Sequence, residues 1–132
     1  MSGENVEIVR QVYEAFQHGD SDKVIDLVSP EVELHGTRGG LSDGSVARGI
    51  QAVRQTFELW DEDWETKLSP QEFIDAGDQV VVLQHELRRG RGSGVEVDAE
   101  TAVLYGLRDG RLIRIQGFMD QDEALEAAGL RE

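Results

Sequence analysis

The second half of the chain alternates apolar and polar residues with a period of two, and this pattern constrains the fold more than any other feature. The alternating stretches cover residues 64–76, 80–89, 95–107 and 112–119. Such alternation is typical of β-strands that bury one face. Asp109-Gly110, between the last two stretches, is a strong hairpin signal because glycine accepts a positive φ. We therefore predict four successive antiparallel strands with short connections, the first of them broken at Pro70.

The first half of the chain instead places its apolar residues at helical spacing. Helices are predicted over residues 6–16, from Ser21 towards Pro30, and over 50–63, with a short final helix over 122–128. Asp20 is a suitable N-cap for the second helix, which Pro30 should end because proline disfavours helical backbone at the residue before it. A short strand over 32–35 and a glycine-rich loop over 36–49 separate the second and third helices. The sequence thus predicts an α+β fold.

Composition narrows the class of protein. A chain of 132 residues predicts a single domain, residues 1–132. The net charge of −14 repels phosphate backbones and anionic lipid surfaces, so neither a nucleic-acid partner nor a membrane partner is expected. The sequence has no cysteine, no apolar run long enough to span a bilayer and no secretory leader at its start, so a cytoplasmic location is expected.

Four short segments carry a resemblance to a known family. They are Tyr13-Glu14-Ala15-Phe16 with Gly19-Asp20, Pro30-Glu31-Val32-Glu33-Leu34, Gly49-Ile50 and Leu107-Arg108-Asp109-Gly110-Arg111-Leu112. In this order they resemble the nuclear transport factor 2-like superfamily, and within it the SnoaL-like and ketosteroid isomerase-like proteins, over nearly the whole chain. The resemblance implies a cone-shaped roll, in which a curved antiparallel sheet and three helices of the N-terminal half enclose a pocket. It also implies a homodimer paired through the outer face of the sheet.

Strand alternation divides the sheet residues into two sets. The more apolar set, which contains Leu83, His85, Val103, Tyr105 and Ile115, is expected to face inward. The other set, which contains Gln84, Glu86 and Arg88 as well as Arg114, Gln116 and Phe118, is expected to face solvent or the dimer partner. The predicted lining for a small apolar ligand is Phe16, Phe57, Trp60, Trp64, Leu83, Val103, Ile115 and Met119. The alternative is that these aromatic side chains only fill a core.

Four residues are candidates for catalysis. His85, placed inside by alternation, could act as a general acid or base on a carbonyl compound, or be a buried histidine satisfied by Tyr105. Tyr13 and Tyr105 could donate a hydrogen bond to a developing oxyanion, or could simply pack. Asp120 could be a base at the pocket opening, or could cap the final helix together with Glu123.

The scattered histidines and the missing cysteines predict no metal site, and no cofactor is expected. Ketosteroid isomerase chemistry is not supported, because the catalytic aspartates of that family fall near His35 or Gly36 and near Val103. The resemblance therefore leaves two hypotheses. One is a cofactor-free isomerase, cyclase or dehydratase that moves a proton on a small hydrophobic carbonyl compound. The other is a non-catalytic ligand-binding or dimeric accessory domain.

Overall fold

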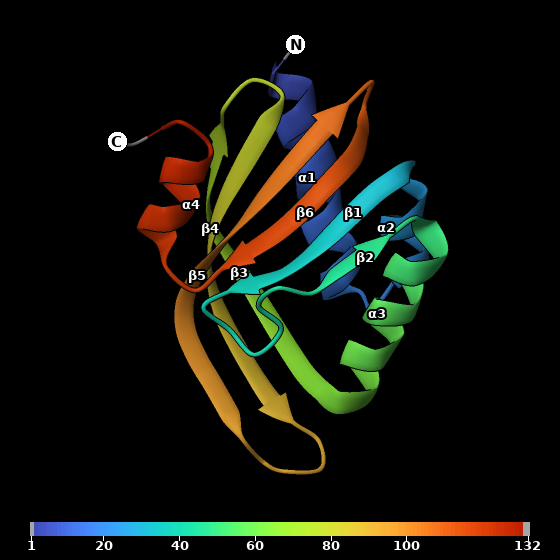
Figure 1. Ribbon diagram of the computed structural model, residues 1–132, viewed down its shortest axis with the longest axis vertical. Helices are drawn as coiled ribbons and strands as arrows, with labels where there is room; N and C mark the ends of the chain where they lie inside the picture. Colours follow the sequence, from blue (N-terminus) through green and yellow to red (C-terminus); the bar gives the residue numbers. More distant parts are fainter. Residues whose placement is uncertain (1, 131–132) are drawn as a thin grey trace.

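The computed structural model describes residues 2–130, and within them four helices and six strands form the fold shown in Figure 1. The helices are α1 (Ser2–Gln17), α2 (Ser21–Asp26), α3 (Ile50–Asp63) and α4 (Gln121–Ala127). The strands are β1 (Val28–Arg38), β2 (Val46–Arg48), β3 (Trp64–Asp75), β4 (Gln79–Gly90), β5 (Glu96–Arg108) and β6 (Arg111–Phe118). No helix in this part of the chain is long and apolar enough to cross a membrane.

All six strands join one curved sheet in the order β2-β1-β6-β5-β4-β3. The predicted antiparallel meander is confirmed, since β3 pairs with β4, β4 with β5 and β5 with β6, each antiparallel. The β1–β6 pair is parallel, which alternation alone could not show. The sheet is therefore antiparallel apart from this one pair, and its curvature creates a concave and a convex face.

Both prolines lie inside strands, although they were predicted to end a helix and to break a strand. The second helix stops at Asp26, and β1 continues through Pro30, which lies between the paired positions Val28 and Glu33. Pro70 lies beside a register shift in the β3–β4 ladder, before Glu72. Proline is tolerated where a strand makes no ladder hydrogen bond through its nitrogen, as at such irregularities.

The hairpin predicted at Asp109-Gly110 is confirmed by its backbone. Asp109 has a φ of 53° and Gly110 a φ of 76°, so both central residues are left-handed. A two-residue turn of this hand matches the twist of the flanking strands. The short β2, by contrast, was not predicted, because its three residues lie inside the glycine-rich stretch 36–49.

The two faces of the sheet are covered by different helices. On the concave face, α1, α2 and α3 pack on a cluster that includes Val80 and Val82. On the convex face, α4 packs on a second cluster that includes Val81 and Phe118. Figure 1 shows α4 on the opposite side of the fold from α2 and α3. The middle of the sheet is thus buried on both faces.

Candidate active site

The concave face and the three N-terminal helices enclose a pocket of about 610 Å³, a size typical of sites for small molecules. Six of the predicted ligand-binding residues line it, namely Phe16, Phe57, Trp60, Trp64, Val103 and Ile115. The rings of Phe16 and Phe57 lie 5.9 Å apart, and those of Phe57 and Trp60 lie 5.8 Å apart. These contacts build a continuous aromatic wall. That the wall binds a ligand stays a prediction.

A second hollow, of about 750 Å³, lies against the first half of α1 and the Asp109-Gly110 hairpin. None of the predicted site residues line it, and neither does any aromatic side chain. We therefore place the candidate site in the aromatic pocket.

A chain of buried hydrogen bonds begins deep in this pocket. The Tyr105 hydroxyl donates to the Tyr13 hydroxyl at 3.0 Å, and the Tyr13 hydroxyl donates to Oε1 of Gln84 at 2.7 Å. The Gln84 side-chain amide then donates to Oγ1 of Thr101 at 3.1 Å. All four residues are at most 2% exposed. Buried polar groups are costly unless they are paired, so each of these bonds helps to hold the next side chain in place.

The chain ends on a carboxylate. Thr101 Oγ1 donates to Oε1 of Glu86 at 3.3 Å, and Nη2 of Arg88 lies 3.5 Å from Oε2 of Glu86. Glu86 is only 8% exposed, and both Glu86 and Arg88 line the pocket. A carboxylate held in such a place can accept a proton from a bound molecule.

Burial decides the protonation state of the Tyr13 and Tyr105 hydroxyls. It raises the pKa of Tyr13 well above its ordinary value, and it raises the pKa of Tyr105 as well. Desolvation disfavours the charged phenolate, so both hydroxyls keep their protons across the physiological range. Each hydroxyl has a single proton, and in this structure that proton is already donated.

The guanidinium of Arg88 contacts the rings of two tryptophans that line the pocket. Its guanidinium carbon is 5.9 Å from the centre of the Trp60 ring and 5.8 Å from that of Trp64, within the range of a cation–π contact. The Nε atom of Arg88 is buried and has no hydrogen-bond partner among the residues that the structure describes. Such orphaned donors are rare in folded proteins, and this one belongs to a side chain that lines the pocket.

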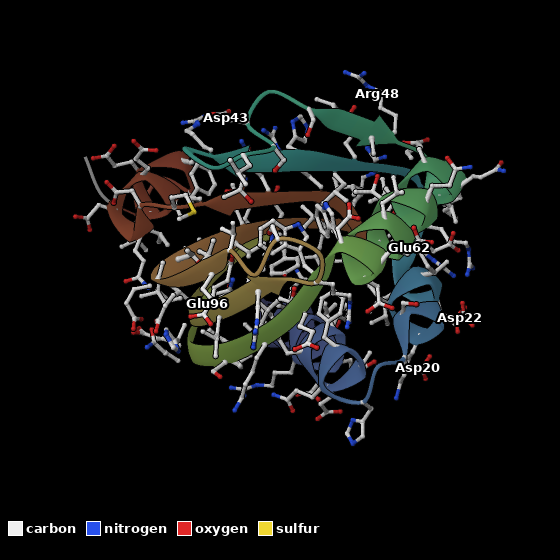
Figure 2. All side chains as sticks on the ribbon, turned by 90° about the horizontal axis from the view of Figure 1, so that it is seen from below. Asp20, Asp22, Asp43, Arg48, Glu62 and Glu96 are labelled. Carbon is white, nitrogen blue, oxygen red and sulfur yellow. The ribbon has the colours of Figure 1, made fainter. Side chains whose placement is uncertain are left out.

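The pocket border on the side of α2 and α3 is acidic, since Asp20, Glu58 and Asp61 all line it. Figure 2 shows Asp20 and Glu62 on this same side of the molecule. Asp20 also caps α2, as predicted, by accepting a hydrogen bond from the backbone of Lys23.

The prediction that His85 and Leu83 face the pocket is wrong. Gln84 pairs with Thr101 across the β4–β5 ladder, so it shares the concave face, and its neighbours in sequence point to the convex face. There the His85 side chain is 37% exposed, and its Nε2 lies 2.6 Å from Oδ1 of Asp98. The hydrogen bond to Asp98 raises the pKa of His85. Its imidazole therefore belongs to the outer surface.

Two further residues from the end of β6 lie outside the pocket. Asp120 is the N-cap of α4 and accepts a hydrogen bond from the backbone of Asp122 at 2.8 Å, which corresponds to the capping alternative. Met119 is not among the lining residues and lies beside Gly39 instead. Both follow the last strand, where alternation no longer decides which way a side chain points.

The predicted dimer face also needs correction. Phe118 is 0% exposed because it is covered by α4 of its own chain, and Gln116 is 8% exposed. Only Arg114 of the three predicted contact residues is exposed, and it donates to the Gln116 side chain at 2.7 Å. Phe118 is therefore not available to a partner subunit.

Sequence reasoning placed the three polar pocket residues of β4, namely Gln84, Glu86 and Arg88, on the outer face, because polar residues were expected to face solvent. The β4–β5 register could have located them. Counting across the short turn at residues 90–94 pairs Gln84 with Thr101, which alternation had correctly placed inside.

A family described as the SnoaL-like domain matches residues 9–115 of this chain. Among solved structures, an NTF2-like protein of unknown function from Burkholderia pseudomallei is similar, with 24% identity, coverage of 93% of this chain and 95% of that one, and a TM-score of 0.78. TerC, crystallised with polyporic acid, is 23% identical, with 96% and 98% coverage and a TM-score of 0.76. A proposed SnoaL-like polyketide cyclase from Jannaschia sp. CCS1 is 20% identical, with 98% and 94% coverage and a TM-score of 0.77. No curated protein matches the chain in sequence.

Proposed function

Because this chain belongs to the SnoaL-like domain family, we propose that it is a cofactor-independent enzyme that moves a proton on a small hydrophobic carbonyl compound. The reaction would be an isomerisation, a cyclisation or a dehydration. The observation that carries the proposal is Glu86, a buried carboxylate in an aromatic pocket, held by Thr101 and close to Arg88. A solved structure of similar fold is a proposed polyketide cyclase, and polyketides are carbonyl compounds.

We assign Glu86 as the general base. Its carboxylate removes a proton from a carbon next to the carbonyl group, so that a carbon–hydrogen bond breaks and an oxygen–hydrogen bond forms on Glu86. The electron pair moves towards the carbonyl oxygen and forms an enolate. A positioned base of this kind contributes about 10²–10⁴-fold to the rate.

Tyr13 and Tyr105 take a positioning role in this proposal. Each hydroxyl already donates its proton within the buried chain of hydrogen bonds, so neither has a free donor for an oxyanion. Through Gln84 and Thr101, the tyrosines instead fix the carboxylate of Glu86. Precise placement of the base matters because misplacement by about 1 Å can cost about 100-fold in rate.

The test begins with a thermal-shift screen of aromatic and polyene ketones and diketones, because a ligand that binds only the folded state raises its melting temperature. Each compound that binds is then incubated with the protein in D2O, and exchange of its α-hydrogens for deuterium is followed by NMR. We expect exchange with the wild type, and at least about 100-fold slower exchange with Glu86→Gln when each protein is saturated with the compound.

Glu100→Gln is the matched control, since Glu100 precedes Thr101 on β5 but is exposed on the convex face. With this variant, the α-hydrogens of the bound compound should exchange at the wild-type rate. If Glu86→Gln exchanges as fast as the wild type, Glu86 is not the base. If compounds bind but none exchanges, the non-catalytic ligand-binding alternative is favoured.

The homodimer and the cytoplasmic location stay predictions. The convex face still exposes Leu87 by 40% and carries the exposed pair His85 and Asp98. Light scattering coupled to size-exclusion chromatography would give the mass in solution directly. A mass of one chain at micromolar concentration would contradict the dimer.

A further inference from the structure

We propose that Arg88, with Trp60 and Trp64, forms an anion-binding subsite, and that the ligand is a flat, largely apolar molecule carrying one acidic oxygen, either a carboxylate or an ionised enol. The inference rests on the proposed function, because it names the class of molecule, an acidic substrate or the ionised product, that the same pocket binds. The subsite depends on Arg88 and the proposed proton transfer depends on Glu86, so experiments can contradict one proposal without contradicting the other.

The first argument is the unused hydrogen-bonding capacity of Arg88. Its Nε is buried without an acceptor in the described part of the chain, and its ion pair with Glu86 is long, at 3.5 Å. Guanidinium groups form short, often bidentate hydrogen bonds to carboxylates, with nitrogen–oxygen distances of about 2.7–2.9 Å. The Arg88 side chain lines the pocket and is 24% exposed, so a negatively charged ligand oxygen can reach its Nη atoms and form shorter hydrogen bonds than the 3.5 Å pair with Glu86.

The second argument is the geometry of the aromatic neighbours. Both tryptophan rings lie within 6 Å of the guanidinium carbon, and both line the pocket. Two hydrogen bonds from Arg91 hold this arrangement. Its side-chain Nε donates to the carbonyl oxygen of Asp61 at 2.8 Å, and its backbone N–H donates to the carbonyl oxygen of Asp63 at 2.8 Å. These bonds tie the β4–β5 turn to the end of α3, between the two tryptophans. A flat ring on this wall would bring its acidic substituent next to Arg88.

The third argument is charge balance during the proposed proton transfer. Before the transfer, Arg88 faces the negative charge of Glu86. After it, Glu86 is neutral and the charge is on the oxygen of the enolate. Arg88 would then stabilise the ionised product with no change in the total charge of the pocket. Groups positioned in advance for a charge that develops on the substrate are a strong source of rate enhancement.

The acidic surroundings work against long-range attraction of an anion. The chain has a net charge of −14, and Asp20, Glu58 and Asp61 line the pocket border. Recognition must therefore come from short-range contacts at Arg88. Assays at about 0.15 M salt screen the repulsion from distant charges, because the Debye length is then about 8 Å.

The test compares matched ligand pairs by calorimetry. The carboxylate arm uses 2-naphthoate against the neutral 2-naphthamide. The enol arm uses 2-hydroxy-1,4-naphthoquinone, ionised at pH 7, against its methyl ether. We expect the wild type to bind the ionised member of at least one pair about tenfold or more tightly than the neutral member, the effect of one charged hydrogen bond. The arm that shows the preference identifies which acidic group is recognised.

Variants separate this subsite from the base. Arg88→Met keeps an unbranched side chain next to the tryptophans and should bind the ionised member of each pair no more tightly than the neutral member. Arg89→Met is the control, because Arg89 is the next residue on β4 and is exposed. It should keep the preference. Glu86→Gln should also keep it, and should bind the anion more tightly because a competing charge is removed.

The outcomes are distinguishable. If the wild type binds the neutral members as tightly as the ionised ones, or if Arg88→Met keeps the preference, the subsite is overturned while Glu86 can still act as the base. If the preference depends on Arg88 but Glu86→Gln exchanges protons normally, the subsite stands and the assignment of the base fails. If no member of either pair binds at millimolar concentration, the subsite is overturned.

Discussion

The two faces of β4 are both polar over residues 84–88, but they do different things. On the concave face, Gln84 and Glu86 are buried and joined through Thr101 into one chain of hydrogen bonds. On the convex face, His85 contacts Asp98 at the surface. Residue type does not separate these two regions, since each holds an acidic group. The difference is that burial forces the concave groups to depend on one another, whereas the convex groups can exchange their partners for water.

The largest loss of stability is expected where α4 covers the convex face, and it tests whether this end of the face is a second hydrophobic core. Phe118 is 0% exposed and packs with Ala124 of α4. Phe118→Ala should lower the free energy of unfolding by about 3–5 kcal/mol, because it removes buried apolar area and leaves a cavity. Urea denaturation followed by circular dichroism measures this. The control is Leu87→Ala on the same face, where the side chain is 40% exposed and the loss should be below about 1 kcal/mol. Equal losses in the two variants would contradict the assignment of a second core.

The next effect concerns the concave chain of hydrogen bonds. Tyr13→Phe leaves Oε1 of Gln84 without its donor and the Tyr105 hydroxyl without its acceptor. Two buried polar groups then lose a partner, and we expect a loss of about 1–3 kcal/mol in the free energy of unfolding. The same denaturation experiment measures it. A loss of less than about 0.5 kcal/mol would mean that the two groups find other partners.

Tyr105→Phe should cost less, about 1 kcal/mol, because Tyr13 still donates to Gln84 and no buried donor is left unpaired. This asymmetry follows from the direction of the hydrogen bonds, from Tyr105 towards Glu86. A double-mutant cycle with Tyr13→Phe measures the coupling between the two hydroxyls. A larger loss for Tyr105→Phe than for Tyr13→Phe would reverse the inferred direction.

The smallest effect is on the convex face and depends on pH. The pKa of His85 is raised in the folded protein, mainly by the hydrogen bond to Asp98 and less by the charge of Glu100. A raised pKa means that folding favours the protonated imidazole. The stabilisation is therefore complete below the ordinary value of 6.5 and is lost as the pH rises through the folded-state pKa.

NMR titration of the His85 ring tests this directly. Asp98→Asn should lower the pKa of His85 towards its ordinary value, and Glu100→Gln should lower it less. Both groups are solvated, so the change in overall stability should be small and should weaken with salt. An unchanged titration in Asp98→Asn would show that the contact does not persist in solution.

Most of the fold could be predicted because it depends on local patterns. Helical spacing located α1 and α3, period-two alternation located β3 to β6, and Asp109-Gly110 located the last hairpin. The parallel pairing of β1 with β6 could not be predicted, since it joins strands far apart in sequence and no local pattern encodes it. Pro30 led to a wrong prediction of where the second helix ends. In the sequence, a proline in an unpaired stretch of a strand looks the same as a proline that follows a helix.

The candidate site was predicted only in part. Aromatic side chains at helical spacing identified one wall of the pocket, and the inward face of β5 was assigned correctly through Val103 and Tyr105. The inward face of β4 was assigned wrongly, because the rule that polar residues face solvent fails where a pocket is itself polar. Val80, Val81 and Val82 are all 0% exposed, so this strand is buried on both faces. Its pattern of apolar residues therefore does not show which alternate residues face the pocket.

Spacing along one chain was therefore enough to predict most of the elements, their order, the family and the aromatic character of the pocket, but not the short β2 or the start of β1. That Glu86 and Arg88 lie inside and His85 outside depends on the folded arrangement of the strands. The physical reason is that a one-residue change of phase moves every side chain of a strand to the other face. On β4 that phase is set by pairing with β5 and by α4 covering the convex side, which are contacts between distant parts of the chain.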